Sequence, residues 1–157
     1  MQLHLLAIGQ KMPAWVIQGY REYARRLPAE CSLHLIEVAA LRRGKNADLA
    51  RIIEQESASL LAAVPRAVSS IVALDERGQQ WTTRQLAAHL DDWRQQGRDV
   101  AFLVGGPDGL NDECRGRAHH VWALSSLTLP HALVRVLVAE QLYRAWSIGA
   151  HHPYHRD

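Results

Sequence analysis

The last residues of the chain combine three side chains that can handle a nucleic acid base. Tyr154, His155 and Arg156 follow one another directly. A phenol ring can stack on an unpaired base, an imidazole can exchange a proton near neutral pH, and a guanidinium can pair with a phosphate. This combination favours a site for single-stranded or looped RNA.

A metal site is the alternative use of the same region, where His151, His152 and His155 lie close together. Zinc sites often add a cysteine or a carboxylate to their histidines. The segment offers neither at ligand spacing, so we expect no metal ion.

Three apolar segments end in sequences that suit a ligand site. They are followed by Leu74-Asp75, by Gly105-Gly106-Pro107-Asp108-Gly109 and by the uncharged segment 124–129. Glycines directly after a buried strand let a ligand approach backbone groups that a Cβ would shield. The segment 124–129 offers backbone amides and methyl groups, which suit an apolar ring such as adenine. A tight turn at 105–109 and a buried connector at 124–129 are the ordinary alternatives.

Several common catalytic motifs are missing from the sequence. No G-x-G-x-x-G spacing is present, and Gly44-Lys45 lacks the upstream glycine and the following Ser or Thr of a P-loop. No G-x-S-x-G nucleophile motif is found either. Cys31 and Cys114 stand far apart without companions, so we expect buried thiols. These absences disfavour the usual NAD and ATP enzymes and nucleophilic hydrolases.

The net charge of +2 conceals a segregation of charge along the chain. Residues 11–51 include eight basic side chains and four acids, whereas residues 54–113 include ten acids and five arginines. Within the basic part, the predicted RNA contacts are Arg42, Arg43 and Lys45. Solvated helix faces are the ordinary alternative, which we prefer for Arg21 and Arg25.

The elements that must position these groups alternate between strands and helices. Apolar runs predict strands at 2–8, 33–38, 68–74, 100–104 and 120–124. Helical spacing and capping residues predict helices after Pro13, from residue 46 or 47, after Thr82-Thr83, and from His131 to Ile148. This alternation predicts an α/β fold with a mostly parallel sheet flanked by helices. The length fits a single domain, 1–157.

The last predicted helix is apolar on nearly all sides, which is wider than the stripe that a surface helix needs. One face can rest on the sheet while another meets a second copy, so we expect a homodimer. No apolar run approaches the roughly 20 residues that cross a bilayer. The amino terminus lacks the basic region and cleavage site of a secretory signal. We therefore expect a cytoplasmic protein with no membrane partner.

Several segments together resemble one known family. They are 43–48 (RGKNAD), 104–110 (VGGPDGL), 124–131, 133–146 and 152–157 (HPYHRD), in this order over essentially the whole chain. They resemble the bacterial ribosomal RNA large subunit methyltransferase H family of the SPOUT class. The resemblance implies an S-adenosylmethionine-dependent enzyme that methylates N3 of a pseudouridine in helix 69 of 23S rRNA, acting on assembled ribosomes as a homodimer. It also implies a deep trefoil knot in the carboxyl-terminal part, which general rules on chain connections would argue against.

The resemblance also implies roles for individual residues. The implied cofactor contacts are Leu74, Gly105, Leu124, Ser125, Ser126, Leu127, Thr128 and Leu129, at the three strand ends described above. Tyr154, His155 and Arg156 would lie over the cofactor of the partner subunit and receive the target nucleotide. His155 or Tyr154 would accept the N3 proton, and Arg156 would stabilise the anionic base or a phosphate. His131 is a second candidate for the base, although a residue beside Pro130 that caps the helix or supports other site residues is the more ordinary interpretation.

Two other classes of protein share parts of this pattern. A nucleotide-binding α/β hydrolase would use the same strand-end glycines, with Asp75 and Asp108 as its acids. A ribosome-binding protein without catalysis would need the basic run and not the segment 124–129. Calorimetry with S-adenosylmethionine separates the three, since only the methyltransferase should bind it.

Overall fold

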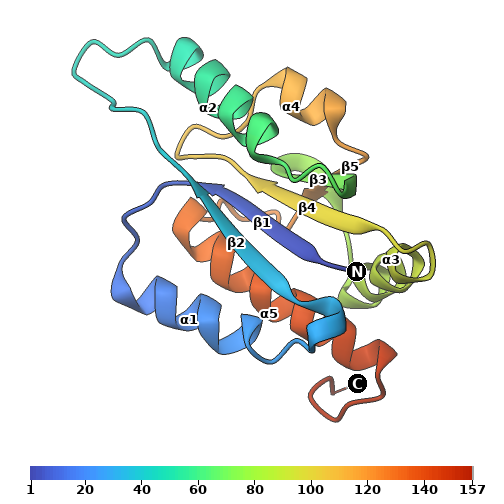
Figure 1. Cartoon of the computed structure of the whole chain (residues 1–157). Helices are drawn as coiled ribbons and strands as arrows, with labels where there is room; N and C mark the ends of the chain where they lie inside the picture. The colour runs from blue at the N-terminus through green and yellow to red at the C-terminus, as the bar shows by residue number, and fades with distance from the viewer. Residues whose placement is uncertain (157) are drawn as a thin grey trace.

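The computed structural model describes residues 1–156 as a parallel sheet with helices on both faces (Figure 1). The strands are β1 Leu3–Ile8, β2 Leu33–Val38, β3 Val68–Gln80, β4 Asp99–Val104 and β5 His120–Ala123. They lie in the order β2-β1-β4-β3-β5, and all neighbours are parallel. The helices are α1 Ala14–Ala24, α2 Leu49–Ala63, α3 Thr83–Gln95, α4 Asp112–Arg117 and α5 His131–Gly149, and a 3-10 helix spans Ala29–Cys31. The predicted α/β fold is confirmed.

The central strands are apolar on both faces because helices cover both. Along β1, Leu3, Leu5 and Ala7 belong to one core cluster, whereas Leu6 and Ile8 belong to the other. All five side chains are fully buried. A strand placed between two cores must be apolar at nearly every position, which explains the continuous apolar run.

The helices divide between the two faces of the sheet. Tyr20 of α1, Leu90 of α3 and Val138 of α5 are buried in the first core. Leu60 of α2 and Cys114 of α4 are buried in the second. Helix α5 contacts both α1 and α3, and Figure 1 shows it across the middle of the sheet, beside α1. Its amino end thereby lies near the carboxyl ends of the strands.

The predicted strand 68–74 is too short, since β3 continues through a polar segment. The extension is held by β5, because residues 79–80 pair with residues 122–123 after an irregularity in the ladder. A Cβ at Gly78 would lie 2.6 Å from the backbone of Val121, so glycine permits this close approach.

Helix boundaries follow the capping residues. Helix α2 begins at Leu49 rather than near residue 46 or 47, because the side chain of Asp48 caps its first turn. Helix α3 begins after Thr82, which caps it as predicted. The short helix α4, which the sequence analysis missed, is capped in the same way by Asn111.

The last part of the chain returns from the edge of the sheet to its middle, since β5 is an edge strand and α5 lies between α1 and α3. This return is compatible with the implied knot, which stays a prediction, as does the single domain 1–157. Within residues 1–156, no helix is both long and apolar enough to cross a membrane.

Candidate active site

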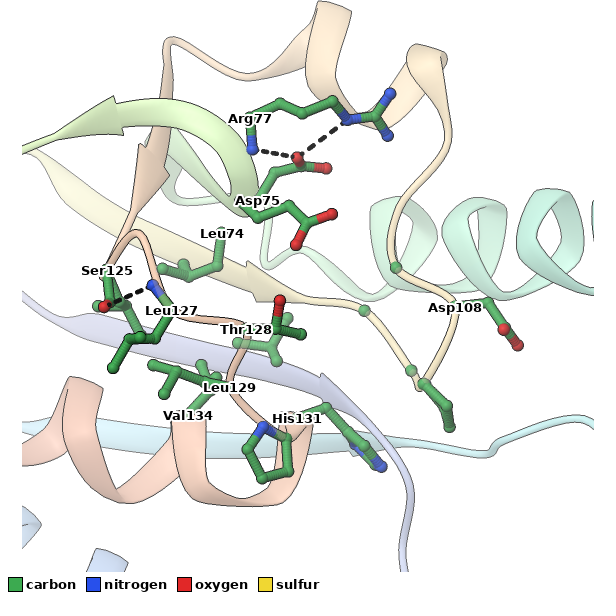
Figure 2. A pocket seen from close by; sticks show the side chains of 18 of the residues that line it. Leu74, Asp75, Arg77, Asp108, Ser125, Leu127, Thr128, Leu129, His131 and Val134 are labelled. Carbon is green, nitrogen blue, oxygen red and sulfur yellow. Dashed lines mark hydrogen bonds and ion pairs between the residues drawn. The ribbon is translucent and has the colours of Figure 1, made fainter.

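A pocket of about 590 Å³ opens at the carboxyl ends of β3, β4 and β5, beside the amino end of α5 (Figure 2). Ligands of open α/β folds bind at this edge of the sheet. Among the implied cofactor contacts, the lining contains Leu74, Gly105, Leu124, Ser125, Leu127, Thr128 and Leu129. Ser126 is exposed and is not part of the lining. The structure thus brings together the three strand-end segments that the sequence singled out.

The segment 124–130 supplies an uncharged wall of the pocket. The backbone N–H of Leu127 donates to Ser125 Oγ at 2.9 Å, which closes a local turn. Leu124 packs against the core, whereas Leu127 is 71% exposed. Leu129 also lines the pocket. Apolar side chains interrupted by hydroxyl groups suit a planar ring without charge.

The turn 105–109 forms another wall, and its geometry requires glycine. The N–H of Gly109 donates to the carbonyl oxygen of Gly106 at 3.0 Å, and Gly109 has a φ of 83°. A Cβ at Gly105 would lie 2.6 Å from the carbonyl carbon of Gly109. The segment is therefore a tight turn and a pocket wall at once, because the turn itself lines the pocket.

The two aspartates at the pocket are bound by arginines. Asp75 accepts hydrogen bonds from Arg77 and, at 3.0 Å, from Arg115 Nη1. Asp108 accepts one from Arg43 Nε at 2.8 Å. Within residues 1–156, no group of three or more His, Cys, Asp or Glu side chains could hold a metal ion. The site therefore lacks the free acid pair that a hydrolase would use.

Arg43, one of the three predicted RNA contacts, belongs to an internal ion-pair network. Its guanidinium donates to Glu56 at 2.8 Å and 3.0 Å and to the carbonyl oxygen of Leu41 at 3.1 Å. Glu56 is only 1% exposed. The bonds to its carboxylate raise the pKa of Arg43 above its usual value. Of the three, Arg42 and Lys45 are exposed and remain available to RNA.

The carboxyl-terminal tail folds back on α5 of its own chain. Tyr154 Oη donates to Glu140 Oε1 at 3.0 Å, and the Tyr154 and Tyr143 rings lie 4.6 Å apart. The Arg144 guanidinium lies 4.7 Å from the centre of the Tyr154 ring. Burial and the bond to Glu140 raise the pKa of Tyr154 to about 12. The phenol stays protonated at neutral pH, which does not suit a base.

The tail and the pocket are separated along α5. Val134 lines the pocket, whereas the tail packs near Tyr143. These two positions are separated by roughly 14 Å of helix. Tyr154, His155 and Arg156 are absent from the pocket lining, so one chain does not bring them to the implied cofactor residues. Asp157, the last residue of the matching motif, lies outside the described residues.

The chain matches one family of enzymes over nearly its whole length. A family model described as "Predicted SPOUT methyltransferase" matches residues 1–155. The chain belongs to this family. It is also 60% identical to Ribosomal RNA large subunit methyltransferase H of Thioalkalivibrio sulfidiphilus (strain HL-EbGR7) over 157 residues, which cover 100% of both chains.

Two solved structures share the fold of this chain. TrmJ from Z. mobilis ZM4 matches with a TM-score of 0.51 and 16% identity, over 99% of this chain and 72% of that one. Lpg2936 from Legionella pneumophila, in complex with the bound cofactor SAM, matches with a TM-score of 0.51 and 13% identity, over 92% of this chain and 66% of that one. At these identities the two structures support the fold alone.

In this SPOUT methyltransferase, His131 lies at the pocket but does not cap α5. Pro130 is the capping residue, and no side-chain hydrogen bond caps the helix. His131 lines the pocket, and its buried Nδ1 has no hydrogen-bond partner among the described residues. Burial, with the guanidiniums of Arg135 and Arg43, lowers the pKa of His131. The capping interpretation is therefore wrong.

The sequence analysis missed Arg135, a charged residue that holds this edge of the methyltransferase together. Arg135 is 1% exposed. It donates to the carbonyl oxygens of residues 8 and 9, at 3.2 Å and 2.6 Å, and to Glu37 Oε2 at 2.8 Å. It thereby fixes the end of β1 against α5. A lone arginine in the apolar run 133–139 was the available signal.

Proposed function

We propose that the protein transfers a methyl group from S-adenosylmethionine to N3 of a pseudouridine in helix 69 of 23S rRNA. It acts in the cytoplasm on assembled ribosomes, as a homodimer. The observation that carries the proposal is the pocket formed by Leu74, the turn 105–109 and the segment 124–129 at the strand ends. The identity of 60% to a Ribosomal RNA large subunit methyltransferase H, over the whole chain, supports the RNA substrate.

The pocket residues fit S-adenosylmethionine, which supplies an electrophilic methyl group when bound. Leu74, Leu124, Leu129 and Val134 provide apolar surface for an adenine ring. The glycines of the turn 105–109 let a ligand approach the backbone closely, because they carry no Cβ. This lining is the reason for preferring S-adenosylmethionine over a ligand with several negative charges.

The protein contributes mainly position and alignment to the reaction. Methyl transfer is an in-line displacement, so the N3 atom must be held about 3 Å from the methyl carbon and in line with the bond that breaks. The pocket walls orient one reactant. Arg42 and Lys45 are exposed and would hold the rRNA through its phosphates.

The homodimer would supply what the pocket of one chain lacks. Tyr154 is held by Glu140 of its own chain, away from its own pocket. A two-fold pair in which each tail covers the other subunit's pocket would complete both sites. The partly exposed Leu133 and Leu137 of α5 offer apolar surface for such a contact. Arg156, which is exposed, would then stabilise the anionic base or a phosphate.

Mass spectrometry of helix 69 RNA tests the substrate and the product together. RNA from cells without the gene should lack one methyl group on the pseudouridine. The purified protein and S-adenosylmethionine should restore that group on isolated ribosomes. Identical helix 69 masses with and without the gene would contradict the rRNA target, and an absence of S-adenosylmethionine binding in calorimetry would contradict the cofactor.

A further inference from the structure

We propose that His131 accepts the proton that N3 of the target base loses during methyl transfer. This inference rests on the proposed function and adds a catalytic residue that belongs to the same chain as the cofactor pocket. His131 directly follows the segment 124–130 and lines the pocket. Figure 2 shows it at the amino end of α5, next to the pocket walls.

The position of the imidazole is fixed by its neighbours. Pro130, with a φ of −63°, sets the backbone where α5 begins. The ring lies close to the buried end of β1, since a Cβ at Gly9 would be 3.8 Å from His131 Cε1 and 3.4 Å from Arg135 Nη2. Because Nδ1 is buried, Nε2 is the nitrogen that can face a ligand in the pocket.

Among the described residues, no hydrogen bond gives the His131 ring a role in holding the fold together. No side-chain bond caps α5, and Nδ1 lacks a hydrogen-bond partner within residues 1–156. Buried polar groups without partners are uncommon in folded proteins and call for an explanation. The ring is thus not held in place by a hydrogen bond at Nδ1, and its other nitrogen, Nε2, is the one to which we assign the reaction.

Three charged groups face His131 from the elements packed around it. They are Arg135 on α5, Arg43 on the segment before α2, and Glu56 on α2. Glu56 is paired with Arg43, while Arg135 is held by Glu37 and the carbonyl oxygens of residues 8 and 9. Burial and the two fixed guanidiniums lower the pKa of His131. The ring is therefore neutral at physiological pH and ready to accept a proton.

The other titratable groups at the pocket suit this task less well. Asp75 and Asp108 are engaged by arginines. Glu76 is exposed to solvent. A general base works best when its pKa lies near the working pH, which favours an imidazole. The phenol of Tyr154 donates a hydrogen bond to Glu140 and lies away from the pocket.

The step balances without any further reactant. The N3–H proton passes to Nε2 of His131, and the electron pair of N3 forms the bond to the methyl carbon. The bond between that carbon and sulfur breaks, its electron pair stays on sulfur, and the sulfonium becomes a neutral thioether. The imidazolium then releases its proton to water, which the two neighbouring guanidiniums favour.

Single-turnover kinetics of His131→Ala and His131→Gln test the proposal on the full-length protein with ribosomes and saturating S-adenosylmethionine. Loss of a general base slows the chemical step by about 100-fold or more. The affinity for S-adenosylhomocysteine should stay within about threefold in calorimetry, and added imidazole should partly restore His131→Ala. His151→Asn is the matched control, because His151 is exposed and has a positive φ that asparagine tolerates. It should keep the wild-type rate.

The pH profile distinguishes a base from a merely structural residue. The wild-type rate should be independent of pH above about 7, because the neutral ring is then fully populated. The variants should gain about tenfold per pH unit, because they depend on ionisation of N3 in solution. A wild-type rate that itself rises tenfold per unit would overturn the proposal, whether or not the variants fold. So would variant rates within about threefold of wild type, an outcome that would point to His155.

Failure of this inference differs from failure of the proposed function. If the wild-type protein does not methylate helix 69, the proposed function is contradicted. If the wild-type protein methylates helix 69 and both His131 variants react at near-normal rates, only the assignment of the base is contradicted.

Discussion

Arg43 and Glu56 form a two-pronged ion pair in which Nη2 lies 2.8 Å from Oε1 and Nη1 lies 3.0 Å from Oε2. Glu56 also accepts a hydrogen bond from the backbone N–H of Leu41 at 2.9 Å. Through Nε, Arg43 reaches Asp108 of the pocket turn. One guanidinium thus ties together α2, the segment before it and a wall of the pocket, and each of its three nitrogens is bonded within the chain.

Arg43→Ala should destabilise the protein by about 3 kcal/mol, because it leaves the carboxylate of Glu56 buried without its partner. Urea denaturation measures the change in the free energy of unfolding. The control is Arg42→Ala at the exposed neighbouring position, where we expect a change within about 0.5 kcal/mol. Equal effects of the two substitutions would show that the buried pair does not hold this segment.

Arg42→Glu with Lys45→Glu should weaken binding to ribosomes and flatten its dependence on salt. Each phosphate contact that is lost lowers the slope of log affinity against log salt by about one. Both side chains are exposed and lie outside the pocket lining, so calorimetry should show unchanged affinity for S-adenosylmethionine. An unchanged slope of log affinity against log salt would show that these two residues do not contact the RNA.

Much of this fold follows from local sequence patterns, and each exception has a physical cause. The apolar run 2–8 predicted the strand β1, and Thr82 correctly marked the start of α3. The short helix α4 was not predicted, because Cys114 is its one buried residue and a single apolar position shows no helical periodicity. The end of β3 was not predicted as strand, because its residues are polar and form a strand only by pairing with β5.

The sequence pointed to the pocket walls but not to the charged network behind them. Strand ends of a parallel sheet share one edge, so Leu74, Gly105 and Leu124 could be grouped before the strand order was known. The contacts of Arg135 with the end of β1 bridge more than 120 residues of sequence. They require β1 to lie inside the sheet, between β2 and β4, with its end beside α5, which no local pattern encodes.

Gly105→Ala should reduce the affinity for S-adenosylmethionine by tenfold or more, on the order of 1.4 kcal/mol in binding. The added Cβ would lie 2.6 Å from the Gly109 carbonyl carbon, so the turn must move away from its position in the pocket wall. Gly116→Ala on α4 is the control, because a Cβ there meets nothing within 4 Å. Titration calorimetry measures both variants, and similar affinities would contradict the role of the turn.

The stability of the protein should fall as the pH is lowered from about 7 to about 5, in part through His89 and His120. Their ring centres lie 4.9 Å apart. Burial lowers the pKa of both histidines below 6.5, and for His120 the neighbouring His89 and His119 lower it further. The unfolded chain therefore takes up protons first as the pH falls through 6.5, and the stability present above this pH is lost.

His89→Leu tests this relation, because it removes one titrating ring and its effect on the other. Urea midpoints at about pH 7.5 and pH 5 should differ less for the variant than for wild type. His151→Asn, at an exposed position, should keep the wild-type difference. An equal or larger fall for His89→Leu would exclude the pair as a source of acid sensitivity.

A mixture of two impaired variants, assayed at a low concentration of S-adenosylmethionine, should regain activity if each tail serves the pocket of the other subunit. Gly105→Ala impairs the pocket and Arg156→Ala impairs the tail, so neither homodimer has a complete site. When equal amounts are unfolded and refolded together, half of the two-fold dimers are mixed and each has one complete site, which predicts about a quarter of the wild-type activity. The control is the same proteins refolded separately and assayed at once after mixing. If co-refolding restores nothing while wild type refolds to full activity, then each tail serves its own pocket, and the roughly 14 Å of helix between Val134 and Tyr143 must be bridged within one chain.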